Sequence, residues 1–266
     1  MKNICEKHTF VICAYKESPF LEECILSLKN QNMQSNIIMV TSTPNNHIRT
    51  LAEKYRIELF VNEGERGIVQ DWNFAYHKCN TPYVTIAHQD DIYFSEYTKR
   101  AMECLEKSNK PLIYFSDYCE IRNGEKIEKN KLLMIKRILL FPLRFKMLQK
   151  SIKARRISLS LGCGICCPSV TFAVKNLPAR IFSVRYRSCE DWEAWERLSK
   201  YKGEFVYDHR ILMGHRIHEG SETSIILGDN ARKKEDYEMF CKFWPSWIAR
   251  ILVGFYSKSE KSNDIE

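Results

Sequence analysis

The chain has 266 residues, of which 44% are hydrophobic and 28% charged, which excludes a disordered chain and supplies apolar residues for one sizeable core. The formal net charge of +8 favours an anionic partner: a phosphate-rich substrate, a membrane or nucleic acid. Eleven irregularly spaced cysteines argue against a disulfide scaffold. With no signal peptide and no transmembrane run in the sequence, we expect a cytoplasmic protein.

The first half of the chain alternates strand-like and helix-like patterns five times over about 115 residues. This alternation predicts an α/β fold: a Rossmann-like, mostly parallel sheet with helices on both faces. Such sheets bind ligands at the carboxyl ends of their strands. The expected strands are residues 9–14, 37–40, 57–61, 83–87 and 112–115, and the expected helices are one from 18, then 43–55, 67–79 and one ending at 106.

The second half is less regular. Residues 131–156 mix apolar and basic side chains, and no acid occurs between 129 and 188. The later expected elements are a strand at 170–174, a helix at 190–201, a strand at 205–207, and a tail helix at 232–256 that Pro245 breaks.

Two adjacent acids, Asp90 and Asp91, follow the expected strand 83–87. Adjacent carboxylates at the end of a buried strand can hold a divalent cation and contact a ribose, because hard cations prefer carboxylate oxygens. The alternative is that these acids only cap the helix that follows.

A second acidic pair, Glu190 and Asp191, begins the expected helix that carries Trp192 and Trp195. One of these carboxylates could take the proton of an acceptor hydroxyl, while the tryptophans form an aromatic wall for a sugar. The alternative is a helix whose first-turn acids only suit the helix dipole.

A late polar segment, residues 216–223, offers a cation, an imidazole and two hydroxyls on what we expect to be a loop. Arg216, His218 and Ser221 would suit a diphosphate or its metal. The alternative is an ordinary polar loop.

Taken in order, these motifs resemble those of the family 2 glycosyltransferases, which have the GT-A fold. Residues 10–28 are similar to their opening strand and helix, and residues 62–73 resemble their Asn-x-Gly-x-x-Gly-x-x-x-x-x-Asn stretch. Residues 88–91 occupy the Asp-x-Asp position. The acidic pair at 190–191 and the late His-x-x-Ser complete a resemblance that covers roughly residues 8–225.

The resemblance implies an inverting transfer of a sugar from a nucleoside diphosphate to an acceptor hydroxyl, with Mg²⁺ or Mn²⁺. Asp191 would be the base with Glu190 beside it, and Trp192 and Trp195 would face the acceptor. Asp91 and His218 would hold the metal, and Arg216, His218 and Ser221 would lie next to the diphosphate. The nucleotide sugar would be bound by Tyr15, Glu17, Asn62, Gly67, Asn73 and Asp90.

The resemblance also implies one glycosyltransferase domain in four parts. These are a nucleotide-sugar-binding half (1–118), a basic apolar insertion (119–160), an acceptor and catalytic half (161–228) and a helical tail (229–266). The implied setting is bacterial surface polysaccharide synthesis, of the capsular or O-antigen type, on a lipid-linked glycan at the inner face of the membrane.

Three positions depart from the family pattern. Thr41-Ser42-Thr43 stands where an acid usually reads the base, so the base stays open. The first acid of the Asp-x-Asp stretch is replaced by His88 or Gln89, and Lys16 stands where Asn is common.

The segment 131–156 reads as an amphipathic element lying in the plane of an anionic membrane. Aromatic residues of the tail could dock at the same interface. The alternative is a helical hairpin packed on the core with a solvated basic face. A zinc site at Cys163, Cys166 and Cys167 is not expected, since no second pair of ligands lies nearby.

Two rival functions remain. A nucleotidyltransferase would show a glycine-rich basic loop after the first strand, but residues 13–19 contain no glycine. A non-catalytic, membrane-peripheral nucleotide-binding module would use only the basic stretch, whose apolar residues favour membrane over nucleic acid.

Overall fold

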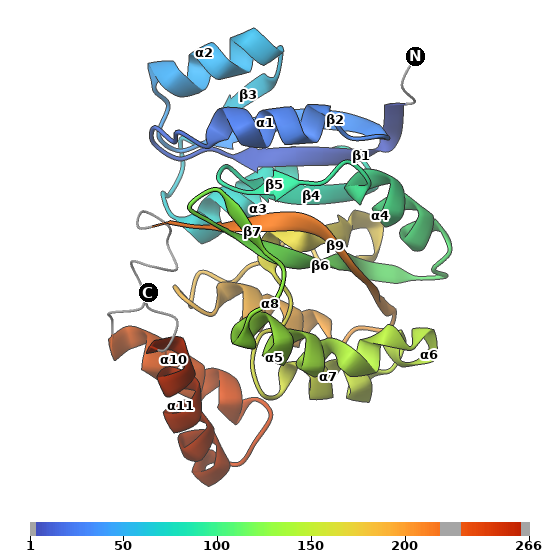
Figure 1. The fold of residues 1–266 in the computed structure, drawn as a ribbon, viewed down its shortest axis with the longest axis vertical. Helices are drawn as coiled ribbons and strands as arrows, with labels where there is room; N and C mark the ends of the chain where they lie inside the picture. Colours follow the sequence, from blue (N-terminus) through green and yellow to red (C-terminus); the bar gives the residue numbers. More distant parts are fainter. Residues whose placement is uncertain (1–3, 219–229, 262–266) are drawn as a thin grey trace.

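The computed structural model of the protein describes residues 4–218 and 230–261. Nine strands of these residues form one sheet with the order β3-β2-β1-β4-β8-β6-β9-β5, and β7 pairs with β6 (Figure 1). The strands are β1 (Ile4–Cys13), β2 (Gln34–Thr41), β3 (Glu58–Val61), β4 (Tyr83–His88), β5 (Ile92–Tyr93), β6 (Pro111–Arg122), β7 (Glu125–Ile127), β8 (Val170–Ala173) and β9 (Glu204–Ile217).

The predicted parallel half is confirmed. β1 pairs in parallel with both β2 and β4, and β2 pairs in parallel with β3. β8 then enters between β4 and β6 and runs antiparallel to both. β6 and β9 pair in parallel over most of their length. The carboxyl ends of β1 and β4 therefore lie side by side at one edge of the sheet.

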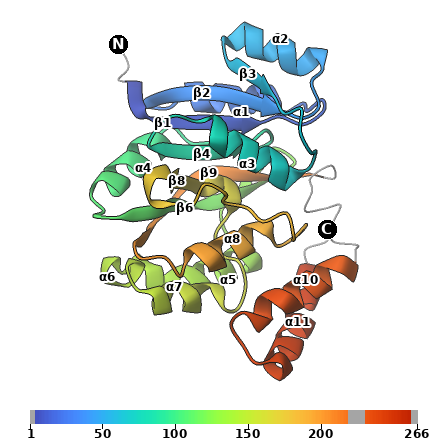
Figure 2. The same cartoon turned by 180° about the vertical axis from the view of Figure 1, so that it is seen from behind.

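Helices cover both faces of this sheet. The two opposite views place α1 and α4 on one face and α3 and α8 on the other (Figure 1, Figure 2). Each pair buries its own apolar core against the sheet. The helices are α1 (Leu21–Lys29), α2 (Asn46–Tyr55), α3 (Ile68–Lys78), α4 (Tyr97–Glu106), α5 (Lys131–Leu140), α6 (Lys146–Gln149), α7 (Ile152–Leu159), α8 (Glu190–Leu198), α10 (Asn230–Cys241) and α11 (Ser246–Lys261).

Side-chain caps set several helix starts. The Asn45 side chain accepts a hydrogen bond from the backbone N–H of Ile48, so α2 begins at Asn46 and not at the expected position 43. The Asn130 side chain caps α5 in the same way. The predicted break at Pro245 is confirmed, since it separates α10 from α11.

Two strands are longer than expected. β6 continues to Arg122, so the expected boundary at residue 118 falls inside a strand. β9 continues to Ile217, so Arg216 lies in a strand and the prediction of a loop there is wrong. Because the two strands bond to each other along their length, each supplies partners that a short apolar run does not reveal.

The insertion forms the 3₁₀ turn Phe141–Arg144 and three short helices, α5 to α7. Some of its basic residues point inward. Arg155 is fully buried, and its guanidinium donates to the carbonyls of Gly203 and Tyr201. Arg156 pairs with Glu196 at 2.5 Å. The insertion is thus packed on the core, as the helical-hairpin alternative expected. No helix in the described part of the chain has the length and apolarity to cross a membrane.

Candidate functional site

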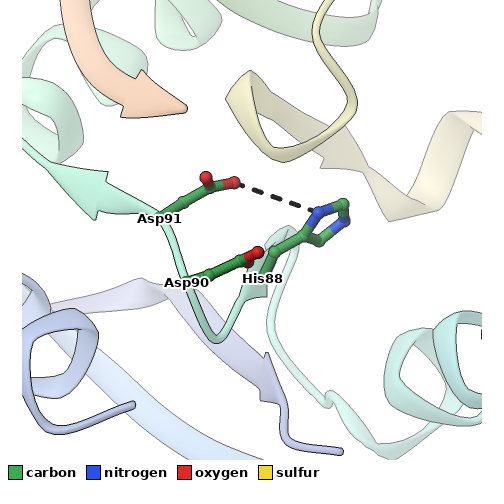
Figure 3. A group of neighbouring side chains, drawn as sticks. All are labelled: His88, Asp90 and Asp91. Carbon is green, nitrogen blue, oxygen red and sulfur yellow. Dashed lines mark ion pairs between the residues drawn. The ribbon is translucent and has the colours of Figure 1, made fainter. Parts of the chain in front are cut away.

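Three side chains that can ligate a metal meet where β4 ends. His88 is the last residue of β4, and Asp90 and Asp91 follow in the turn to β5. Each offers one ligand atom, and these atoms lie within 4.8 Å of one another (Figure 3). Oxygen ligands suit Mg²⁺ and Mn²⁺, and an imidazole beside them favours Mn²⁺.

The Asp91 carboxylate is fully buried, and its two oxygens have different surroundings. Oδ1 accepts hydrogen bonds from the backbone N–H of Arg216 at 2.9 Å and from Nδ1 of His215 at 3.0 Å. Oδ2 has no hydrogen-bond partner within the described residues and lies 3.9 Å from Nδ1 of His88. A buried carboxylate oxygen without a donor is costly unless a cation neutralises it.

The charges around Asp91 keep it ionised. Burial acts to raise its pKa, but His215, His88 and the N–H of Arg216 outweigh burial and lower the pKa below 3.8. Burial lowers the pKa of His88, whose ring stacks on Trp72 at 5.0 Å and whose Nε2 has no partner in the described chain. An ionised carboxylate beside a neutral imidazole is a donor set that fits a divalent metal.

The turn that carries both aspartates is held from β9. Arg216 donates from Nε to the carbonyl of Asp90 at 2.8 Å, pairs with Glu23 at 2.5 Å and lies over the Phe20 ring at 4.4 Å. Arg216 therefore fixes this turn, and its expected place next to a diphosphate stays a prediction. Nε2 of His218 lies 3.1 Å from Oδ2 of Asp90, one contact away from the metal-ligating group. Ser221 lies outside the described residues.

Asp191 stands in the first turn of α8, next to Glu190, which is buried. Oδ1 of Asp191 accepts from the backbone N–H of Trp192 at 2.5 Å, and Oδ2 accepts from Sγ of Cys163 at 3.7 Å. Burial raises the pKa of Asp191 above 3.8. The Asp191 charge also acts on the pKa of His88, so the second acid pair and the metal-ligating group share one region.

Lys136 of α5 belongs to this region, although the sequence reasoning missed it. Its Nζ donates to the hydroxyl of Tyr118 at 2.7 Å, and its charge acts on Asp191 and His215. Its place in a long basic stretch hid it, because the stretch gives no sign of which cation turns inward.

Helix α10 holds the turn that precedes α8. Both carboxylate oxygens of Glu235 accept backbone N–H groups there: Arg187 at 2.9 Å, Ser188 at 2.8 Å and Cys189 at 3.2 Å. A carboxylate is favourable at a helix start because it faces unsatisfied N–H groups. The position of Asp191 thus depends on a helix about 45 residues downstream.

The prediction that two tryptophans face the acceptor is wrong. Trp192 is 1% exposed and Trp195 is fully buried. Nε1 of Trp192 donates to the carbonyl of Leu159, and Trp195 stacks on Phe172 in the core. The ring of Trp192 packs instead against Phe240 and Phe243 of the C-terminal part of the chain.

Of the residues predicted to bind the donor, Tyr15 and Glu17 are exposed, whereas Asn62 and Asn73 are buried. Tyr15 and Glu17 are exposed just beyond β1, and Gln89 bonds to both the N–H and the carbonyl of Tyr15. Gly67 precedes α3 at a φ of 147°, a conformation that side chains rarely adopt. Asn62 is buried and donates to Asp71 at 2.7 Å.

Asn73 has a structural role, and its predicted donor role stays a prediction. Its Nδ2 donates to the carbonyl of Phe182 at 2.9 Å, and its Oδ1 accepts from the N–H of Phe182 at 3.1 Å. Its amide therefore links α3 to a segment 109 residues away.

Asn73→Ala is expected to lower the free energy of unfolding by about 1–3 kcal/mol, because two buried backbone groups of Phe182 lose their partner. Urea denaturation measures this loss, and Asn36→Ala, an exposed residue of β2, serves as the control. If Asn73→Ala has the stability of the wild type but binds nucleotide more weakly, the structural assignment is contradicted and the predicted role of Asn73 in donor binding is supported.

The chain is similar to known proteins both in sequence and in fold. The model of the family described as Glycosyl transferase family 2 matches residues 9–172. No curated protein matches the sequence significantly.

Solved structures match over nearly the whole chain. TarS 1-349 from S. aureus superposes with a TM-score of 0.62 at 13% identity, covering 97% of this chain and 72% of TarS 1-349. The mannosyltransferase PcManGT from Pyrobaculum calidifontis gives 0.60 at 11%, covering 96% and 73%. Glucosyl-3-phosphoglycerate synthase from Mycobacterium tuberculosis gives 0.56 at 12%, covering 89% and 80%. At these identities the likeness establishes the fold, and the expected GT-A fold is confirmed.

Proposed function

The chain belongs to glycosyl transferase family 2, and on this premise we propose that it moves a sugar from a nucleoside diphosphate to an acceptor hydroxyl, with inversion. The observation that carries the proposal is the group of His88, Asp90 and Asp91, with Asp191 in the same region. Solved structures that share the fold include TarS with UDP-GlcNAc and PcManGT with GDP-Man and Mn²⁺. A donor of that class would suit the carboxyl edge of β1 and β4 here.

A divalent cation, Mg²⁺ or Mn²⁺, would be held by Asp91 together with His88 and Asp90. Oδ2 of Asp91 and Nε2 of His88, which have no hydrogen-bond partner among the residues that the structure describes, support this assignment. When bound, such a cation stabilises the negative charge of a departing diphosphate. His218 would steady Asp90 through the contact at 3.1 Å.

Asp191 would act as the general base. In a single displacement the acceptor oxygen bonds to the anomeric carbon, the bond from that carbon to the diphosphate breaks, and the acceptor proton passes to the Asp191 carboxylate. The raised pKa of Asp191 makes it a stronger base than an exposed aspartate. The N–H of Trp192 would hold its position, as would Glu235, which accepts the backbone N–H groups of the turn before α8.

The activity is expected to fall as the pH drops through the raised pKa of Asp191, since only the ionised carboxylate can take the proton. The positive charge of Lys136 lowers that pKa, against burial. Lys136→Met therefore moves the acid limb of the kcat/KM profile to higher pH, whereas Lys131→Met, an exposed residue of the same helix, leaves it in place. An acid limb that stays in place or moves to lower pH in Lys136→Met would contradict the assignment of Asp191.

The acceptor is proposed to be a lipid-linked glycan in bacterial surface polysaccharide synthesis, with the enzyme peripheral to the cytoplasmic face of the membrane. Exposed apolar side chains on α5, α6 and α7 support this setting. The two substrates of this reaction would then be a soluble nucleotide sugar as donor and an amphiphile as acceptor.

Ligand-induced stabilisation tests the proposed donor class. Melting temperatures are measured with UDP-, GDP-, CMP- and dTDP-sugars, each with Mn²⁺ and with chelator. One donor is expected to stabilise the protein by about 2.7 kcal/mol at a hundred times its Kd, and only with metal. The proposal fails if none of the UDP-, GDP- and dTDP-sugars raises the melting temperature with Mn²⁺.

A further inference from the structure

Exposed apolar side chains gather at one end of the molecule. They lie on α5 to α7, on the turn after α7 and on α11, a surface called here the apolar-basic face. Both views place these helices at the end opposite α2 (Figure 1, Figure 2). Its most exposed apolar residues are Met134, Ile138, Met147, Ile157, Trp247 and Phe255, and Met147 reaches 85% exposure.

The insertion and the C-terminal helix form one continuous surface. A Cβ built on Gly162 would lie 3.0 Å from Tyr256 of α11 and 3.7 Å from Leu139 of α5, so these two side chains meet at this glycine. Nε1 of Trp244 also donates to the carbonyl of Ser160, just beyond α7. The exposed neighbours of these contact points therefore belong to the same face.

The charged side chains of this face are basic wherever the structure describes its side chains. No acid occurs between 129 and 188 or between 246 and 256. Lys131, Lys146 and Lys153 are exposed among the apolar side chains of the insertion, and Arg250 is exposed on α11. A patch of apolar side chains with interspersed cations and no acids complements an anionic bilayer.

The contribution of charge is smaller than the sequence suggests. Arg155 is buried, Arg156 pairs with Glu196, and Arg137 donates to the carbonyl of Tyr118. These cations cannot meet lipid headgroups. Apolar insertion must therefore supply most of the affinity, with each remaining basic residue adding a modest electrostatic share.

We propose that the apolar-basic face docks on an anionic bilayer, with the helices of the insertion and α11 lying in the interface. α5 then separates two environments, since Ile135 and Ile138 face outward while Lys136 turns in toward Tyr118 and acts on Asp191. Docking places the proposed base close to the bilayer surface. This gives the acceptor a chemical class, an amphiphile whose reactive hydroxyl lies near the headgroups, and this part rests on the proposed function.

Vesicle co-sedimentation tests the docking. The full chain is mixed with vesicles of phosphatidylcholine alone or with 30% phosphatidylglycerol. The triple variant Ile138→Ser, Met147→Ser, Trp247→Ser is compared with Leu26→Ser, a 42% exposed residue of α1. Wild type and Leu26→Ser are expected to bind the anionic vesicles, and the triple variant about tenfold or more weakly, with an unchanged circular dichroism spectrum and melting temperature.

Equal vesicle binding by the wild type and the triple variant overturns the proposal. The proposal is also overturned if the wild type is a dimer and the triple variant is a monomer, because the face would then bind a second copy of the chain. Hydrolysis of a soluble nucleotide sugar separates this inference from the proposed function. Hydrolysis without vesicle binding overturns the docking alone, and vesicle binding without any donor turnover supports the docking while the proposed function fails.

Discussion

Asp191→Asn is expected to lower kcat for sugar transfer by about 10²–10⁴-fold, the usual contribution of a general base. The change removes the proton acceptor and little else, because the amide oxygen can still accept from the N–H of Trp192. KM for the donor should change little, since the donor is proposed to bind at the carboxyl edge of β1 and β4 and Asp191 is proposed to act on the acceptor hydroxyl. Steady-state kinetics with a saturating acceptor measure both constants.

The neighbouring acid supplies the matched control. Glu190 shares the first turn of α8 and is buried, so Glu190→Gln tests whether any lost carboxylate at this position has the same effect. We expect a smaller loss than for Asp191→Asn. Slow hydrolysis of the donor by water should survive in Asp191→Asn. If Asp191→Asn keeps full transfer activity and Glu190→Gln is inactive, Glu190 and not Asp191 is the general base.

Asp91→Asn is expected to remove metal-dependent activity, with a loss on the order of 10³-fold. Lewis-acid stabilisation of a leaving group contributes several kcal/mol, and each 1.36 kcal/mol corresponds to a factor of ten. The substitution removes the negative charge of the buried Asp91 carboxylate, while the amide oxygen that replaces it can still accept a hydrogen bond from the N–H of Arg216. Mn²⁺ binding, followed by electron paramagnetic resonance, should weaken in parallel.

His218→Gln serves as the comparison for Asp91→Asn. His218 contacts Asp90 but lies outside the group of three ligand atoms, so its loss should weaken Mn²⁺ binding less. Outer partners of ligands commonly change metal affinity by about 10–100-fold. Turnover that stays Mn²⁺-dependent and near wild type in Asp91→Asn would contradict the assignment of the metal site.

Local patterns were enough to predict the parallel half of the fold. The strands β1 to β4 are short apolar runs separated by amphipathic helices, and the consecutive strands β1, β2 and β3 are neighbours in the sheet. The same patterns placed Asp90 and Asp91 at a strand end. The strand β8 was also expected, at residues 170–174, but its place in the sheet could not be predicted in this way, because it pairs with β4 across more than 80 residues and runs antiparallel to it. No local periodicity records such a long-range pairing.

The site was predictable where function depends on one short motif and not where it depends on packing. His215 and Arg216 reach Asp91 from β9, more than 120 residues away in the chain. The spacing of Trp192 and Trp195 is that of a buried helix face, and the prediction of an aromatic wall for a sugar did not take this spacing into account. Asn73 satisfies a motif position, but its amide bonds to backbone in the core.

Turnover of a nucleotide sugar is the most direct test of the central claim. Release of nucleoside diphosphate from a panel of UDP-, GDP- and dTDP-sugars is measured with Mn²⁺ and with chelator, beside Asp91→Asn. We predict that one donor is turned over, that chelator stops the reaction and that Asp91→Asn abolishes it. If no donor is turned over, or if turnover is equal in wild type and Asp91→Asn, the metal-dependent transferase assignment is wrong.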